Sequence, residues 1–172
     1  QGGDKTEMTD FLDDFLGESE WSDAEIRLLV CDDHALFRRG LIATVEEISG
    51  IEVLGEAATV EEAVALAEEL APDVVLMDLQ MPGMSGLQAI EAIRREDPQA
   101  KIVVLTILGG DEDIFRAIRA GAASYLLKSS LSQDLISTMR RVFAGERPMP
   151  PEVAVRLAIR EGQSGLSTRE IE

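Results

Sequence analysis

The chain has 172 residues, enough for one domain with a sizeable hydrophobic core and short appendages. Its net charge of −17 is unfavourable for binding nucleic acid, and its single cysteine, Cys31, excludes a disulfide framework and a cysteine-based zinc site. No apolar run approaches the ~18 residues of a membrane span and no signal-like segment begins the chain, so we expect a cytoplasmic protein without a membrane partner.

The first 25 residues form a strongly acidic leader, with nine acids and one base for a net charge of −8. Apolar residues at helical spacing predict a short amphipathic helix over residues 8–16. They are Met8, Phe11, Leu12, Phe15 and Leu16. A helix this short is not stable alone. Two interpretations stay open: a disordered solubilising tail, or a helix that docks on the following domain, on a second subunit or on another protein.

From residue 26 onward, apolar strands alternate with amphipathic helices. The predicted strands span residues 26–31, 51–57, 73–77, 101–106 and 123–128. The predicted helices span residues 36–48, 59–70, 87–93, 114–121 and 131–145. Thr59 is the expected N-cap of the second helix, with Glu62 at the capping-box position. This alternation predicts a doubly wound α/β fold, in which a five-stranded parallel sheet is covered by helices on both faces.

Polar side chains mark the carboxyl ends of four predicted strands. Strand one is followed by Asp32 and Asp33, strand three by Asp78, strand four ends in Thr106 and strand five in Lys128, whereas strand two offers no comparable group. Each residue alone is explained by a turn, a helix cap or a solvated side chain. Ligands of open parallel sheets bind at this edge, so the set together indicates one site.

The chemistry of this set points to phosphoryl transfer. Three clustered carboxylates repel one another and favour a divalent cation, for which Mg²⁺ is the natural candidate because it prefers oxygen ligands. A carboxylate beside such an ion can attack phosphorus and form an acyl phosphate. The ion and the lysine neutralise charge on the transferred oxygens. The threonine hydroxyl can then bond the phosphoryl group and move the loop after strand four.

Four sequence motifs carry a resemblance to a known family. Residues 26–145 contain LLVCDDH, VVLMDLQMPGMSG, VVLT and YLLK in this order. In combination and spacing they resemble the receiver domain of two-component response regulators. The resemblance implies a flavodoxin-like (βα)5 fold with the strand order 2-1-3-4-5. It also implies a phosphoacceptor that catalyses its own phosphorylation and dephosphorylation, rather than an enzyme acting on a separate substrate.

The resemblance also assigns roles to the residues of the site. Asp78 would accept a phosphoryl group from a sensor histidine kinase, and Thr106 and Lys128 would contact that group. Asp33, Asp78 and the main-chain carbonyl of Gln80 would bind Mg²⁺ or Mn²⁺, with Asp32 acting through water. Tyr125 matches the aromatic switch position, which turns inward when the threonine moves. His34, the single histidine, is taken as a loop or helix-start residue without a site role.

The stretches DDHALFRRGL and GAASYLLKSS are similar to the NarL/LuxR branch of the family. In that branch a DNA-binding helix-turn-helix follows the receiver. Residues 146–165 are the expected linker, with a helix over residues 151–161 and a flexible spacer from residue 162. Residues 166–172, LSTREIE, resemble the start of the helix-turn-helix. The resemblance implies a homodimer that binds promoter DNA only as the full-length protein, with no DNA-binding residues among these 172.

Two other functions compete with this regulator. A receiver that acts by protein contact alone would need no DNA-binding segment, and the LSTREIE tail argues against it. A phosphatase of the haloacid dehalogenase type also uses an aspartyl nucleophile, but it needs a second acid two residues later, where this chain has Gln80. The dimer face stays open between the first and fifth helices and the surface of helix four, strand five and helix five.

Overall fold

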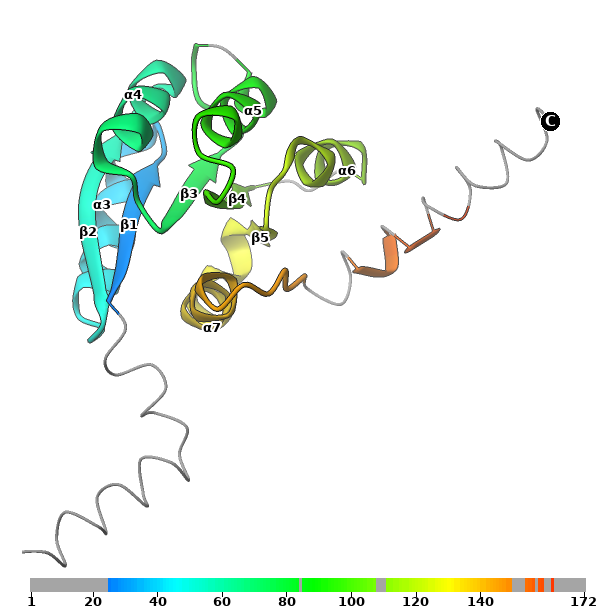
Figure 1. Ribbon diagram of the computed structural model, residues 1–172. Helices are drawn as coiled ribbons and strands as arrows, with labels where there is room; N and C mark the ends of the chain where they lie inside the picture. The colour runs from blue at the N-terminus through cyan, green and yellow to red at the C-terminus, as the bar shows by residue number, and fades with distance from the viewer. Residues whose placement is uncertain are drawn as a thin grey trace, which may run out of the picture.

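The computed structural model describes residues 25–83, 85–107 and 111–149, with helical residues at 154–156, 158–159 and 162. Its core is a five-stranded parallel sheet in the order β2-β1-β3-β4-β5 (Figure 1). The strands are β1 (Ile26–Cys31), β2 (Ile51–Ala57), β3 (Val74–Asp78), β4 (Lys101–Thr106) and β5 (Ser124–Leu127). This confirms the fold class and strand order that the sequence predicted.

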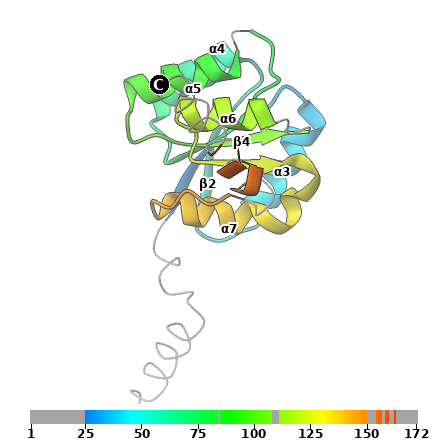
Figure 2. The same cartoon turned by 90° about the vertical axis from the view of Figure 1, so that its right-hand side faces the viewer.

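Five helices connect and follow the strands. They are α3 (Ala35–Glu46), α4 (Val60–Leu70), α5 (Gly86–Glu96), α6 (Asp111–Ala120) and α7 (Leu131–Phe143), the last preceded by the 3-10 turn η1 (Lys128–Ser130). In Figure 2, α4, α5 and α6 lie above the sheet, and α7 lies below it with α3 on the same side. Right-handed crossovers of this kind are the rule for parallel strands.

The residues of β1 show why its sequence is apolar from Leu28 to Cys31. Leu29 and Cys31 pack into the core under α4, α5 and α6, while Leu28 and Val30 pack into the core under α3 and α7. All four side chains are fully buried. Because successive side chains of a strand point to opposite faces, a strand covered on both faces must be apolar at every position.

The bounds of two strands differ from the prediction. Asp73, expected in β3, lies before the strand, where its carboxylate accepts a hydrogen bond from the Arg27 N–H at 2.9 Å. Asp78, which the sequence analysis set at the carboxyl end of this strand, is its last residue and pairs with Leu105 of β4. Lys128, expected to end β5, instead begins η1. The helix predicted over residues 36–48 runs from Ala35 to Glu46.

Helix caps position the turn that follows β3. The expected capping box at Thr59 is only half formed: the Thr59 hydroxyl accepts from Glu62 N, but the Glu62 carboxylate accepts from Ala58 N. A complete capping box joins Ser85 and Gln88 at the start of α5.

Gly86, the first residue of α5, lies against the turn after β3. A Cβ atom at Gly86 would lie 2.9 Å from the Leu79 Cα. Glycine therefore allows α5 to begin close against the turn that carries Asp78.

The appendages are described only in part. The predicted helix over residues 8–16, the rest of the leader before residue 25 and the expected helix-turn-helix start at residues 166–172 lie outside the described residues. The described residues 154–156, 158–159 and 162 are helical and fall within the expected linker segment, whose bounds stay a prediction. In the part of the chain that is described, no helix has both the length and the apolar character needed to span a bilayer.

Candidate functional site

The ends of β1 and β3 bring two acids together at the centre of the sheet edge. Cys31 and Met77 are register partners, so the next residues, Asp32 and Asp78, lie beside each other on neighbouring strands about 5 Å apart. Asp32 is fully buried and Asp78 is only 2% exposed. Two buried carboxylates this close need positive charge beside them.

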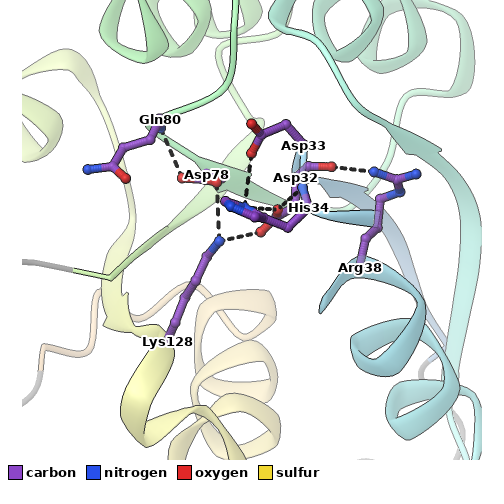
Figure 3. Close-up of polar contacts among 7 residues, drawn as sticks. All are labelled: Asp32, Asp33, His34, Arg38, Asp78, Gln80 and Lys128. Atoms are coloured by element: carbon purple, nitrogen blue, oxygen red, sulfur yellow. Dashed lines mark hydrogen bonds and ion pairs between the residues drawn. The ribbon is translucent and has the colours of Figure 1, made fainter. Parts of the chain in front are cut away.

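Lys128 supplies that charge. Its Nζ lies 2.6 Å from Asp32 Oδ2 and 3.2 Å from Asp78 Oδ2, and its side chain is 9% exposed (Figure 3). Burial by itself would lower the pKa of Lys128, but the two carboxylates outweigh burial and leave that pKa raised. The ammonium also lies 4.4 Å from the centre of the Phe37 ring, which covers it from the side of α3. Lys128 is therefore a permanent cation.

Asp33 and His34 complete the acidic side of the site. His34 is the N-cap residue of α3, as expected for a helix-start residue, and its N–H donates to Asp32 Oδ1 at 2.7 Å. Its ring makes no capping bond; Nδ1 instead lies 3.1 Å from Asp33 Oδ1. One ligand atom from each of Asp32, Asp33, His34 and Asp78 falls within 4.8 Å of the others. The ring thus belongs to the site, a placement that the sequence analysis did not foresee.

The turn after Asp78 holds its carboxylate from the opposite side. Gln80 N donates to Asp78 Oδ1 at 2.9 Å, as Figure 3 shows. This bond leaves Oδ2 to face Lys128. The Gln80 residue itself is exposed, so its main-chain carbonyl lies in a turn at the surface of the site.

Thr106 and Tyr125 lie one strand further along the sheet. Thr106 follows Leu105, the register partner of Asp78, and is 3% exposed. Tyr125 is fully buried, so it occupies the inward position and not the surface. Burial raises the pKa of the Tyr125 phenol, and the neighbouring Thr106 side chain opposes part of that rise. The phenol makes no hydrogen bond of standard geometry, although the Thr106 side chain lies close enough to lower its pKa.

Arg38 is a part of the site that the sequence analysis missed. Its Nη1 donates to the main-chain carbonyl of Asp32 at 2.5 Å, and its Nε donates to Glu56 Oε1 at 3.0 Å. Glu56 lies in β2 and is exposed; it pairs with Arg38 and is not part of the acidic cluster. The spacing of the two residues in the sequence indicated this position. Arg38 follows His34 by one helical turn and so faces the end of β1.

The residues of this acid pocket fit a divalent cation. We define the acid pocket as Asp32, Asp33, Asp78 and Lys128; its formal charge is −2, which one dication would neutralise. Asp32 Oδ2 is buried and accepts no hydrogen bond of standard geometry, despite its short contact with Lys128. Carboxylate and carbonyl oxygens are the ligands that Mg²⁺ prefers. Asp33, Asp78 and the Gln80 carbonyl could hold such an ion.

Comparison with known proteins decides the family. A family profile described as the response regulator receiver domain matches residues 28–140. The chain belongs to this family. Response regulator GacA of Pseudomonas aeruginosa is 40% identical over 155 residues, which cover 86% of this chain and 72% of GacA. Transcriptional regulatory protein LiaR of Bacillus subtilis is 43% identical over 155 residues, which cover 86% of this chain and 74% of LiaR.

Solved receiver structures agree with this assignment. A LuxR-family response regulator from Aurantimonas sp. SI85-9A1 is 36% identical with a TM-score of 0.75, covering 80% of this chain and 99% of that one. The receiver of the NarL response regulator from Mycobacterium tuberculosis is 30% identical with a TM-score of 0.68, covering 72% and 99%. The chain is therefore a NarL/LuxR-type receiver of a two-component phosphorelay, and the phosphatase alternative is set aside.

Proposed function

We propose that Asp78 is the phosphoacceptor of this receiver and that its donor is a phosphohistidine of a sensor histidine kinase. The observation that carries this proposal is the Lys128 ammonium, which lies between the carboxylates of Asp32 and Asp78. An oxygen of Asp78 attacks phosphorus, and the P–N bond of the donor breaks as the P–O bond forms. The imidazole leaves with the electron pair, while Lys128 balances negative charge on the phosphoryl oxygens. Water later hydrolyses the acyl phosphate in the same pocket.

The metal requirement follows from the charge of the acid pocket. Asp33, Asp78 and the Gln80 carbonyl would hold Mg²⁺ or Mn²⁺, and Asp32 would act through water. When bound, the ion supplies positive charge to the phosphoryl oxygens. The clustered ligand atoms of the three acids support this assignment.

The switch joins the acid pocket to β5. The Thr106 hydroxyl donates to the phosphoryl group, which draws the end of β4 toward Asp78. Tyr125 then stays in its inward position, packed in the core below α6. The proximity of Thr106 to the buried Tyr125 phenol supports a shared movement.

The output is control of transcription by a longer protein. The name of LiaR describes a transcriptional regulatory protein, and a similar S. aureus structure, 25% identical with a TM-score of 0.65, is described as a DNA-binding response regulator of the LuxR family. By this analogy, phosphorylation favours a homodimer in the cytoplasm, and a helix-turn-helix after residue 165 binds promoter DNA. Pairing two DNA-binding modules raises their joint affinity.

The phosphoacceptor is tested with acetyl phosphate and Mg²⁺, read by intact mass and peptide mapping. The wild type should gain one phosphoryl group and Asp78→Asn none. Asp73→Asn is the matched control, since Asp73 lies at the opposite end of the same strand and its hydrogen bond from Arg27 N survives as an amide oxygen. Phosphorylation of folded Asp78→Asn, or a phosphopeptide that lacks residue 78, would disprove the assignment.

Metal binding is tested by stability. Mg²⁺ at a hundred times its Kd should raise the free energy of unfolding by about 2.7 kcal/mol, because only the folded chain assembles the site. Asp33→Asn should abolish most of this gain, and Glu91→Gln, an exposed acid on α5, should keep it. An equal Mg²⁺ effect in both variants would show that the ion binds elsewhere.

A further inference from the structure

The amino-terminal edge of the sheet carries a basic hollow of about 490 Å³. We define the basic hollow by four cations that line it: Arg94, Lys101, Arg119 and Arg147. They come from α5, β4, α6 and the segment after α7. One acid lines the same hollow, Glu146, and its carboxylate already faces Arg141 at 3.4 Å. The hollow is therefore positive on a chain whose net charge is −17.

Main-chain carbonyls, not carboxylates, hold three of these four cations. Arg94 Nη1 donates to Ala100 O at 2.8 Å, Lys101 Nζ to Phe143 O at 2.8 Å and Arg147 Nη2 to Ala122 O at 2.9 Å. Arg119 lies over the Phe115 ring, 5.5 Å from its centre. Within the described part of the chain, none of the four forms an ion pair with an acid. Each arginine keeps N–H donors that these bonds leave available to an anion.

The leader matches this hollow in charge and in reach. Its net charge is −8, and Glu18, Glu20 and Asp23 are its last acids before Glu25. The strand β1 begins at the same edge as β4, two strand spacings or about 10 Å away. Three extended residues span about 10 Å, so the carboxylates between residues 18 and 23 reach the hollow without strain. Figures 1 and 2 place the start of β1 and the end of α7 toward the same lower side of the molecule.

We propose that the acidic leader docks in the basic hollow of its own chain, through the carboxylates nearest to β1. The leader then lies against Gly145, Glu146 and Arg147, where the chain leaves the receiver. This contact places the leader beside the segment that leads to the output and away from Asp78, which lies at the opposite edge. The leader is thus a regulatory element of the output side, with no part in phosphoryl chemistry.

A second surface competes for the leader, and the test must distinguish it from the basic hollow. An apolar groove between α3 and α7 is lined by Leu36, Phe37, Leu41, Leu135 and Ile136. Leu36 is 88% exposed there. The apolar stripe of residues 8–16 would suit this groove, but the one cation that lines it, Lys128, is already paired with Asp32 and Asp78. Charge complementarity favours the basic hollow, and docking there must weaken as salt rises.

The test uses the full chain with a nitroxide label on Ser19→Cys. Cys31 is fully buried, so the label reaches only the new thiol. Line broadening of backbone amide signals should concentrate at Gly121, Ala123 and Gly145 at low salt and fade at high salt. Arg119→Gln with Arg147→Gln should weaken docking about two- to five-fold per lost cation and reduce the broadening. The matched control, Arg39→Gln with Arg95→Gln, removes the same charge from exposed sites elsewhere and should keep it.

Three results would overturn the proposal. One is broadening that the Arg119 and Arg147 substitutions leave unchanged. Another is broadening centred on Leu36 and Ile136, which would place the leader in the apolar groove. The third comes from a mixture of spin-labelled chains with isotope-labelled chains that carry no nitroxide. Broadening there equal to that within a single labelled chain would show that the leader docks on a second copy.

Discussion

The positively charged side chains at the two edges of the sheet have different partners. At the carboxyl edge, the Lys128 ammonium is in direct contact with the Asp32 and Asp78 carboxylates, and the site still has a formal charge of −2. At the amino edge, Arg94, Lys101 and Arg147 donate to main-chain carbonyls. The carboxyl edge therefore has more acids than cations, whereas the cations of the basic hollow pair with no acid among the described residues.

This difference separates the proposed phosphoryl chemistry at the carboxyl edge from the proposed regulation by the leader at the amino edge. In the proposed function, a dication and a phosphoryl group together satisfy the carboxyl edge, because one brings the positive charge that the other requires. The amino edge is satisfied by the carboxylates of the leader, without any reaction. Three sets of substitutions test this difference between the two edges.

The largest effect is expected from Lys128→Met. Removal of the ammonium leaves two buried carboxylates facing each other and takes away charge that stabilises the transferring phosphoryl group. We expect phosphorylation by acetyl phosphate to slow about a hundredfold, measured by intact mass against time. Lys101→Met, which removes a lysine from the other edge, should leave the rate unchanged. Equal slowing in both variants would mean that the edges are not functionally separate.

A smaller effect is expected at the rim of the basic hollow. Gly121 and Gly145 both have left-handed backbones, with φ of +117° and +98°. Alanine at either position should cost about 1–2 kcal/mol of unfolding free energy. Gly121→Ala should cost more, because its Cβ would lie 3.0 Å from Arg94 Nε, whereas Gly145 has nothing within 4 Å. Urea unfolding of both variants measures the difference, and equal losses would show that Arg94 moves away freely.

The smallest effect concerns Tyr125, which lies between the two edges. Its pKa is raised above 10.0, chiefly by burial, so the folded chain keeps the phenol neutral where the unfolded chain ionises it. Stability must therefore fall as pH rises above 10.0, by at most about 1.4 kcal/mol per pH unit from this group. Tyr125→Phe should flatten that fall in urea unfolding at several pH values. An unchanged slope would mean that the phenol ionises freely and is not buried in solution.

Much of the carboxyl edge could be predicted from the chain alone. Asp32, Asp33, Asp78 and Lys128 were placed at strand ends by pattern, and parallel strands bring those ends to one edge. Their assigned roles stay predictions. The ring of His34 and the guanidinium of Arg38 were not placed, because their positions depend on how α3 packs against the ends of β1 and β2.

The sequence alone determined the order of strands and helices along the chain, the apolar centre of each strand and the positions of the acids, because these follow from local periodicity and from the burial of both sheet faces. Only the tertiary structure decided which cations meet carboxylates and which meet carbonyls. Arg94 and Arg147 are separated by 53 positions, yet both line one hollow. Charge pairing between residues so far apart in the sequence depends on how the helices and strands pack, and no local sequence pattern predicts it.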